Sequence, residues 1–162
     1  MAVHAGAISG LAQEDYTLIE AEHTRLRGTI DNLRDTCRNL ETTRGCSECS
    51  REKLGTCRGR LVSFFYNIMD FSANHFKHEE SIMGRWSQMN DECADLHRHQ
   101  QAHRDILLEL AALVGEGVML DLQGSTAHAY RRLYLGVGDL FEQHERLFDD
   151  PFIRSTSGGA SR

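Results

Sequence analysis

The sequence predicts an all-α protein, an antiparallel up-down-up-down four-helix bundle. Apolar residues recur at alternating steps of three and four along four separate segments, which is the spacing that keeps one stripe of a helix facing a partner. The chain of 162 residues has one proline, many helix-forming residues and no alternating strand pattern. Short connections join segments of comparable length, so neighbouring helices are expected to run in opposite directions.

The first helix is expected to begin near residue 12, after a small, glycine-containing arm at residues 1–11, and to reach about residue 40. Its stripe consists of Tyr16, Ile19, His23, Leu26, Ile30, Leu33, Cys37 and Leu40. The charged residues of the segment fall outside this stripe. His23 and Cys37 are therefore expected in the buried face of an amphipathic helix.

The second helix, expected at about residues 56–86, carries ionisable groups where core residues are due. Its stripe consists of Leu61, Phe65, Ile68, Ser72, His75, Glu79, Ile82 and Trp86. An imidazole and a carboxylate in an apolar seam cost several kcal/mol unless something pairs with them. A metal ion bound by His75 and Glu79 is the simplest such partner.

The third helix is expected at about residues 91–114, ending at Gly115 and Gly117, and Pro151 is expected to stop the fourth. The stripes are Leu96, His99, His103, Ile106, Leu110 and Leu113 in the third helix and Tyr130, Leu133, Val137, Leu140 and His144 in the fourth. The bundle domain is thus expected to span residues 12–153. The tail at 154–162 has few apolar residues and is expected to be disordered.

All four stripes contain metal-ligating side chains, namely His23, His75, Glu79, His99, His103 and His144. The groups late in the second helix and early in the third lie at similar distances from their joint, so they meet at the same end of the bundle. A single seam histidine is usually a hydrogen-bonded core residue. Five of them in matching stripes, together with a carboxylate, predict a metal site.

Four ordered motifs carry a family resemblance: Ile19-Glu-Ala-Glu-His23-Thr-Arg-Leu26, His75-Phe-Lys-His-Glu79-Glu-Ser-Ile-Met83, His99-Gln-Gln-Ala-His103 and His144-Glu-Arg-Leu-Phe-Asp149. With these motifs the chain resembles the hemerythrin-like proteins, which are non-haem di-iron oxygen-binding four-helix bundles. The resemblance implies two iron ions with a bridging oxygen. It places His99, His103 and His144 on one iron, His23 and His75 on the other, and Glu79 and Asp149 across both.

This implied ligand set leaves one coordination position open. Five imidazoles, two bridging carboxylates and a bridging oxygen are one ligand short of filling two six-coordinate irons. The open position falls on the iron held by His23 and His75, where dioxygen would bind. Such a histidine-rich set also suits iron better than magnesium or calcium, which prefer oxygen ligands.

Asp149 needs a separate argument because it follows His144 by five residues, which is about 140° around an ideal helix. We expect the approach of Pro151 to loosen the last turn and let Asp149 swing inward. Asp150 is the competing candidate. Glu80 and His78 lie off the stripe of the second helix and are expected to be solvated.

Four cysteines, Cys37, Cys46, Cys49 and Cys57, surround the predicted loop at about residues 42–57, and the resemblance does not explain them. In a cytoplasmic chain such a group indicates metal or redox chemistry more than structural disulfides. One interpretation is a tetrahedral thiolate site for one zinc ion. The others are a reversible dithiol switch, with basic neighbours lowering the thiolate pKa values, and unrelated buried cysteines.

The net charge of −6 and the lack of a basic run argue against nucleic acid or a membrane surface as a partner. No apolar run approaches the roughly 20 residues of a membrane span, and the N-terminus does not resemble a signal peptide, so a cytoplasmic location is expected. The sequence indicates no particular protein partner.

Three functions fit these features. The first is reversible dioxygen binding for storage, delivery or sensing, without turnover. The second is a di-iron enzyme that handles nitric oxide or peroxide or supplies iron for cluster repair. The third is a zinc-containing interaction module. We favour the first because the ligand stripes show no further general acid or base.

Overall fold

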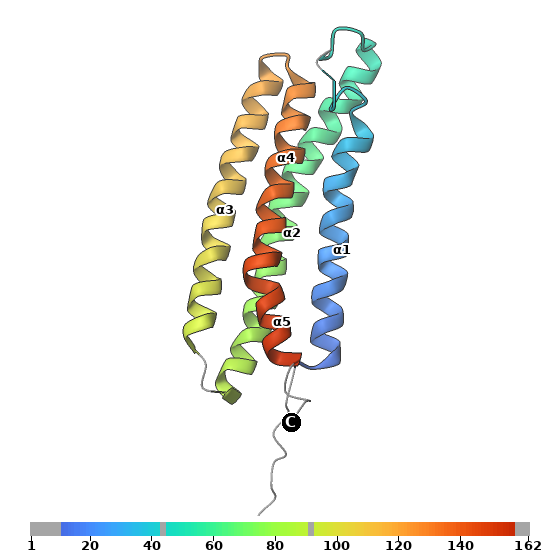
Figure 1. The fold of residues 1–162 in the computed structure, drawn as a ribbon. Helices are drawn as coiled ribbons and strands as arrows, with labels where there is room; N and C mark the ends of the chain where they lie inside the picture. Colours follow the sequence, from blue (N-terminus) through green and yellow to red (C-terminus); the bar gives the residue numbers. More distant parts are fainter. Residues whose placement is uncertain (1–10, 43–44, 91–92, 158–162) are drawn as a thin grey trace, which may run out of the picture.

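Four long helices lie side by side and alternate in direction (Figure 1) in the computed structural model, which describes residues 11–42, 45–90 and 93–157. They are α1 (Gln13–Thr36), α2 (Arg51–Asn90), α3 (Cys93–Leu122) and α4 (Thr126–His144). The chain then continues through a π-helix, Glu145–Asp149, into α5 (Asp150–Ser157). The predicted all-α bundle is confirmed. No helix in the described ranges is both long and apolar enough to cross a membrane.

The helix α3 does not end at Gly115 and Gly117 as predicted but continues to Leu122. A glycine inside a helix costs only about 1 kcal/mol, and packing outweighs that cost here. At Gly117 an added Cβ would lie 3.2 Å from side-chain atoms of Leu133 and Phe65, so the missing side chain lets these neighbours approach. The turn comes instead at Gly124, which has a left-handed φ of 80°.

The prediction that Pro151 stops the last helix is also wrong, because α5 begins at Asp150 and runs to Ser157. Proline is tolerated in the first turn of a helix, where its missing N–H leaves no required bond unmade. Residues 154–157, which we expected in a disordered tail, are therefore helical. The remaining tail residues, 158–162, and most of the expected arm, residues 1–10, lie outside the described ranges.

The apolar core fills the half of the bundle that lies nearer the α1–α2 loop. Its completely buried members include Ile68, Leu110, Leu133 and Val137, each 0% exposed. The ionisable stripe residues occupy the other half, towards α5. The core therefore holds the four helices at a fixed spacing beside the polar cluster.

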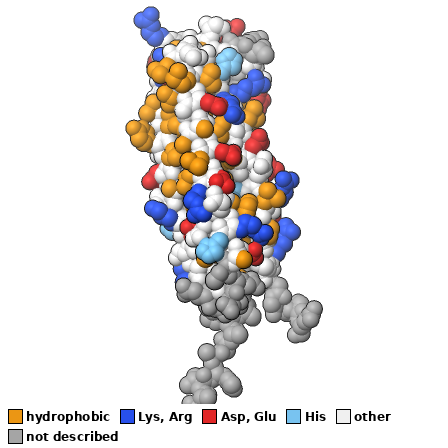
Figure 2. All heavy atoms as spheres, turned by 90° about the vertical axis from the view of Figure 1, so that its left-hand side faces the viewer, with side chains coloured by type: hydrophobic (Ala, Val, Ile, Leu, Met, Phe, Trp, Pro, Cys, Tyr) orange, Lys and Arg blue, Asp and Glu red, His pale blue; other side chains and the backbone are white. Residues whose placement is uncertain are grey.

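Apolar side chains also gather over the upper part of the surface shown in Figure 2. A groove there is lined by Val62, Phe65, Tyr66, Met69, Val114, Val118 and Leu122, with two acidic neighbours. These residues precede His75 in α2 and follow His103 in α3. The groove is thus displaced along the bundle from the ionisable cluster.

Two leucines of α3 provide a matched test of the core. Leu110 is 0% exposed and Leu108 is 71% exposed. We expect Leu110→Ala to lower the free energy of unfolding by about 2–5 kcal/mol, because the substitution removes buried apolar contacts and leaves a cavity. Leu108→Ala should change it by less than about 0.5 kcal/mol. Urea denaturation followed by circular dichroism measures both, and equal losses would contradict the packing described.

Candidate metal centre

The bundle brings together all seven side chains that the sequence analysis singled out for a metal. Their exposed fractions are His23 5%, His75 1%, Glu79 3%, His99 3%, His103 1%, His144 3% and Asp149 3%. Every long helix contributes at least one imidazole. So many ionisable groups are rarely buried together unless they share charges or a metal ion.

The Glu79 carboxylate lies between two sets of histidines. Its Oε1 atom is 3.4 Å from His23 Nε2 and 3.2 Å from His75 Nε2. Its Oε2 atom is 3.1 Å from His103 Nε2 and 3.8 Å from the Nε2 atoms of His99 and His144. One oxygen therefore faces the histidine pair and the other faces the histidine triplet.

The Asp149 carboxylate, in the π-helix that follows α4, also lies between the two sets of histidines. Its Oδ2 atom is 3.3 Å from His23 Nε2, and its Oδ1 atom is 3.1 Å from the Nε2 atoms of both His99 and His144. The side chains form two groups, and within each group the potential ligand atoms all lie within 4.8 Å of one another. The first group consists of Glu79, His99, His103 and His144. The second consists of Glu79, Asp149, His23 and His75. Two adjacent ions spanned by the carboxylates fit this geometry.

A π-helix turns Asp149 inward. In this turn the Asp150 N–H donates to the Glu145 carbonyl, five residues earlier, so side chains five apart are brought onto one face. The inward position was predicted, but its expected cause, a helix loosened before Pro151, was wrong. Asp150 points elsewhere: it is 43% exposed and lies 3.2 Å from Arg154.

Several buried atoms of the cluster have no hydrogen-bond partner. Among the described residues these include His23 Nε2, His99 Nε2 and Asp149 Oδ1. Oppositely charged groups lie within 3.4 Å of each, so the atoms are close to one another but misaligned for hydrogen bonding. His103 Nε2 and His144 Nε2 are also only 3.1 Å apart. Lone pairs that converge in this way fit shared metal ions better than they fit each other.

A model of the hemerythrin HHE cation-binding domain matches residues 14–145 of the chain. The chain belongs to the hemerythrin family. Comparisons with curated proteins and with solved structures gave no match. The family match makes this hemerythrin a cation-binding protein and includes six of the seven clustered side chains. It stops four residues before Asp149, which the structure places in the cluster.

The two carboxylates of the cluster favour the protonated form of the histidines that face them. Burial acts most strongly and by itself lowers the pKa of the histidines, but Asp149 and Glu79 together outweigh it. The pKa of His23 is raised to about 10 and that of His144 to about 9. The same pairs hold the pKa values of Glu79 and Asp149 below their usual range despite burial. Ligating imidazoles must be neutral, so metal binding displaces these protons.

Two further carboxylates orient the histidines from outside the cluster. His75 Nδ1 lies 2.9 Å from Glu22, and His103 Nδ1 lies 2.8 Å from Glu80. A carboxylate on the far ring nitrogen fixes the tautomer that leaves Nε2 free for a metal. Glu22 also accepts from His78, at 2.6 Å.

As expected, Glu80 and His78 lie off the buried stripe: His78 is 49% exposed, and Glu80 is partly exposed at 32%. The expectation did not include their hydrogen bonds, through which each joins the chain of groups behind the cluster. Stripe counting missed these contacts because it assigns residues to one helix face, whereas they form between the edges of neighbouring stripes. One sequence signal could have indicated such contacts. Glu80 directly follows the candidate ligand Glu79, just as Glu22 directly precedes the candidate ligand His23.

The two adjacent aspartates allow a controlled test of the cluster. Asp149→Asn removes the charge that two sets of histidines share, so we expect the metal content of the purified protein to fall by about one ion or more per chain. Asp150→Asn should leave it unchanged, because Asp150 lies outside the cluster. Elemental analysis after identical purification measures both. Equal metal content in the two variants would contradict the assignment of Asp149.

The pKa shifts also predict how metal removal changes stability. His23 and His144 have raised pKa values, so their pairs stabilise the metal-free fold below about pH 6.5 and lose this effect as pH rises to about 9–10. The lowered pKa values of Glu79 and Asp149 stabilise the fold above about pH 4 and lose this effect on acidification. The urea midpoint of chelator-treated protein should therefore fall between pH 6.5 and 9 more steeply than that of metal-loaded protein. If the urea midpoints of the two forms changed equally with pH, the predicted effect of the histidine pKa shifts on stability would be contradicted.

Proposed function

We propose that this hemerythrin holds two iron ions and reversibly binds dioxygen for storage, delivery or sensing. The observation that best supports this proposal is a cavity of about 470 Å³ beside the cluster. It is lined by His23, His75 and Asp149, whereas none of the histidine triplet lines it. A small ligand entering here meets the side of the cluster that has fewer protein ligands.

The donor set supports iron. Five imidazoles and two carboxylates suit iron better than magnesium or calcium. With both carboxylates and a bridging oxygen, the histidine triplet completes six ligands on one ion, and the pair, His23 and His75, leaves one position open on the other. Iron would supply the reversible electron donation to dioxygen, and the chain supplies the open side and the access route.

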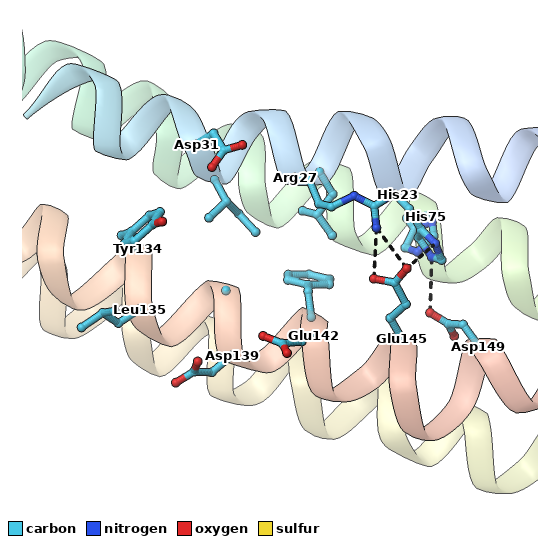
Figure 3. Close-up of a pocket in the computed structure, with 14 residues that line it drawn as sticks. His23, Arg27, Asp31, His75, Tyr134, Leu135, Asp139, Glu142, Glu145 and Asp149 are labelled. Atoms are coloured by element: carbon cyan, nitrogen blue, oxygen red, sulfur yellow. Dashed lines mark hydrogen bonds and ion pairs between the residues drawn. The ribbon is translucent and has the colours of Figure 1, made fainter.

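The cavity wall is partly apolar and partly charged. Leu26, Ile30 and Phe141 contribute apolar surface, and the lining also includes the carboxylates of Asp31, Asp139 and Glu142. Arg27 and Glu145 point toward one another from the two helices that border the cavity (Figure 3). Arg27 Nη1 lies 3.0 Å from Glu145 Oε1, with Arg27 51% and Glu145 37% exposed. The same carboxylate oxygen is 3.8 Å from His23 Nδ1. Glu145 therefore joins Arg27 to the side of the cluster that faces the cavity.

The main test is reconstitution of the metal-free protein with ferrous iron under anaerobic conditions. We expect about two irons per chain. A charge-transfer absorption should appear on exposure to oxygen and disappear on degassing. Iron that is oxidised irreversibly while peroxide or nitric oxide is consumed would favour the enzyme alternative. Failure to bind iron, with zinc in its place, would favour the interaction module.

A glycine in the cavity wall offers a second test. Gly138 lines the cavity, and a Cβ added there would meet no atom within 4 Å. Gly138→Leu should therefore fold normally and narrow the cavity, slowing dioxygen binding by about tenfold for an added barrier of about 1.4 kcal/mol. Gly138→Ala is the matched control and should have a smaller effect. Iron content should stay unchanged in both, and an unaltered stopped-flow rate in the leucine variant would contradict access through this cavity.

A further inference from the structure

Four cysteines line a second cavity, of about 530 Å³, near the other end of the bundle. Cys37 caps the end of α1, Cys46 and Cys49 belong to the loop, and Cys57 lies in the second turn of α2. All four are free thiols. Cys57 precedes His75 by 18 residues, which is about 27 Å along a helix. This cluster is therefore separate from the candidate metal centre.

N–H groups point at two of the four sulfur atoms. The Ala127 backbone N–H donates to Cys46 Sγ at 3.2 Å, and Asn39 Nδ2 donates to Cys49 Sγ at 3.7 Å. Ala127 lies in the first turn of α4, where the helix dipole is positive. Such donors stabilise sulfur in its thiolate form, which is the form that binds metals.

The loop is folded so that both of its sulfurs face the cavity. The Cys49 N–H donates to the Cys46 carbonyl at 3.1 Å and closes a turn around the intervening residues. Asn39 Nδ2 also donates to the Gly45 carbonyl at 2.6 Å, and Gly45 has a left-handed φ of 61°. One asparagine thus holds the loop and contacts the sulfur of Cys49.

Positive charge is available for a thiolate cluster. Lys53 lines the same cavity, and its Nζ donates to the Thr36 carbonyl at the end of α1, at 3.2 Å. Arg38 lines the cavity as well. Four thiolates around a divalent ion carry a net charge of about −2, which these cations and the N-terminus of α4 would balance.

We propose that Cys37, Cys46, Cys49 and Cys57 bind one zinc ion in a tetrathiolate site that ties the α1–α2 loop to the start of α4. Four cysteine sulfurs at about 2.3 Å form a common tetrahedral zinc site. Each thiol releases its proton to solvent as its zinc–sulfur bond forms, and no oxidation state changes. In the described part of the chain no three of these sulfurs lie within 4.8 Å of one another, so zinc binding has to draw the sulfurs closer together.

The dithiol switch explains these features less well. A redox-sensing thiol is exposed and has a lowered pKa. Cys37 and Cys57 are only 8% and 7% exposed, and burial raises the pKa of both thiols, so only the half-buried Cys46 and Cys49 could form such a pair. A disulfide between them would leave the other two sulfurs unexplained, whereas all four line one cavity. The proposal does not depend on dioxygen binding at the other end of the bundle.

The first experiment compares zinc content among variants purified without chelator. We expect Cys46→Ser/Cys49→Ser to contain about one zinc fewer per chain than the native protein. Cys93→Ser is the matched control, because α3 begins at Cys93, at the far end of α2 from the loop, and its zinc content should be unchanged. The difference between variants is the measured quantity, since the histidine cluster can also take up zinc. Equal zinc content in all three proteins would overturn the proposal.

A second experiment uses only the native protein, so it does not depend on whether a variant folds. Metal-depleted native protein is titrated with cobalt(II) under reducing, anaerobic conditions. We expect a sulfur-to-cobalt charge-transfer band and the intense visible bands of a tetrahedral site, displaced by added zinc. The histidine and carboxylate cluster contains no sulfur and produces no such charge transfer. Absence of the band, or a disulfide among the four cysteines in protein purified in air with no zinc bound, would overturn the proposal.

Discussion

The structure depends on the burial of two carboxylates among five imidazoles. Removing either carboxylate would leave cationic or unpaired groups in an apolar bundle, which is far more costly than losing an exposed ion pair. Each carboxylate therefore presents one oxygen to the histidine pair and one to the triplet. Protons on the imidazoles balance the two carboxylates, and a metal ion that binds the same nitrogens has to displace those protons.

The π-helix makes this sharing geometrically feasible. An ideal helix that placed His144 inward would direct Asp149 away from it. The shifted hydrogen-bond register at Glu145–Asp149 brings Asp149 into the cluster, and Glu145 at the start of the same turn lines the cavity. The same π-helical turn thus contains a carboxylate shared by the cluster and Glu145, which pairs with Arg27 in the cavity wall. π-Helical turns of this kind are often found at functional sites.

Side chains of the kinds that bind metals gather towards both ends of the bundle, and apolar residues pack between them. Near α5 the donors are imidazoles and carboxylates on rigid helices, and further carboxylates behind them fix the ring orientations. Near the α1–α2 loop the donors are sulfurs, two of them on a loop held by Asn39. The helix α4 extends between the two, since its first turn contacts Cys46 and its last residue is His144.

The sequence by itself determined the all-α bundle and the set of buried ionisable residues, because the apolar stripe is a local property of each helix. It also carried the family resemblance, which the domain match confirms. Packing between helices decided the rest. Helix α3 continues through Gly117 because Leu133 and Phe65 pack into the space that a side chain there would occupy. Packing likewise turned Asp149 inward and paired Glu80 with His103, since these contacts depend on how neighbouring helices meet and not on spacing within one helix.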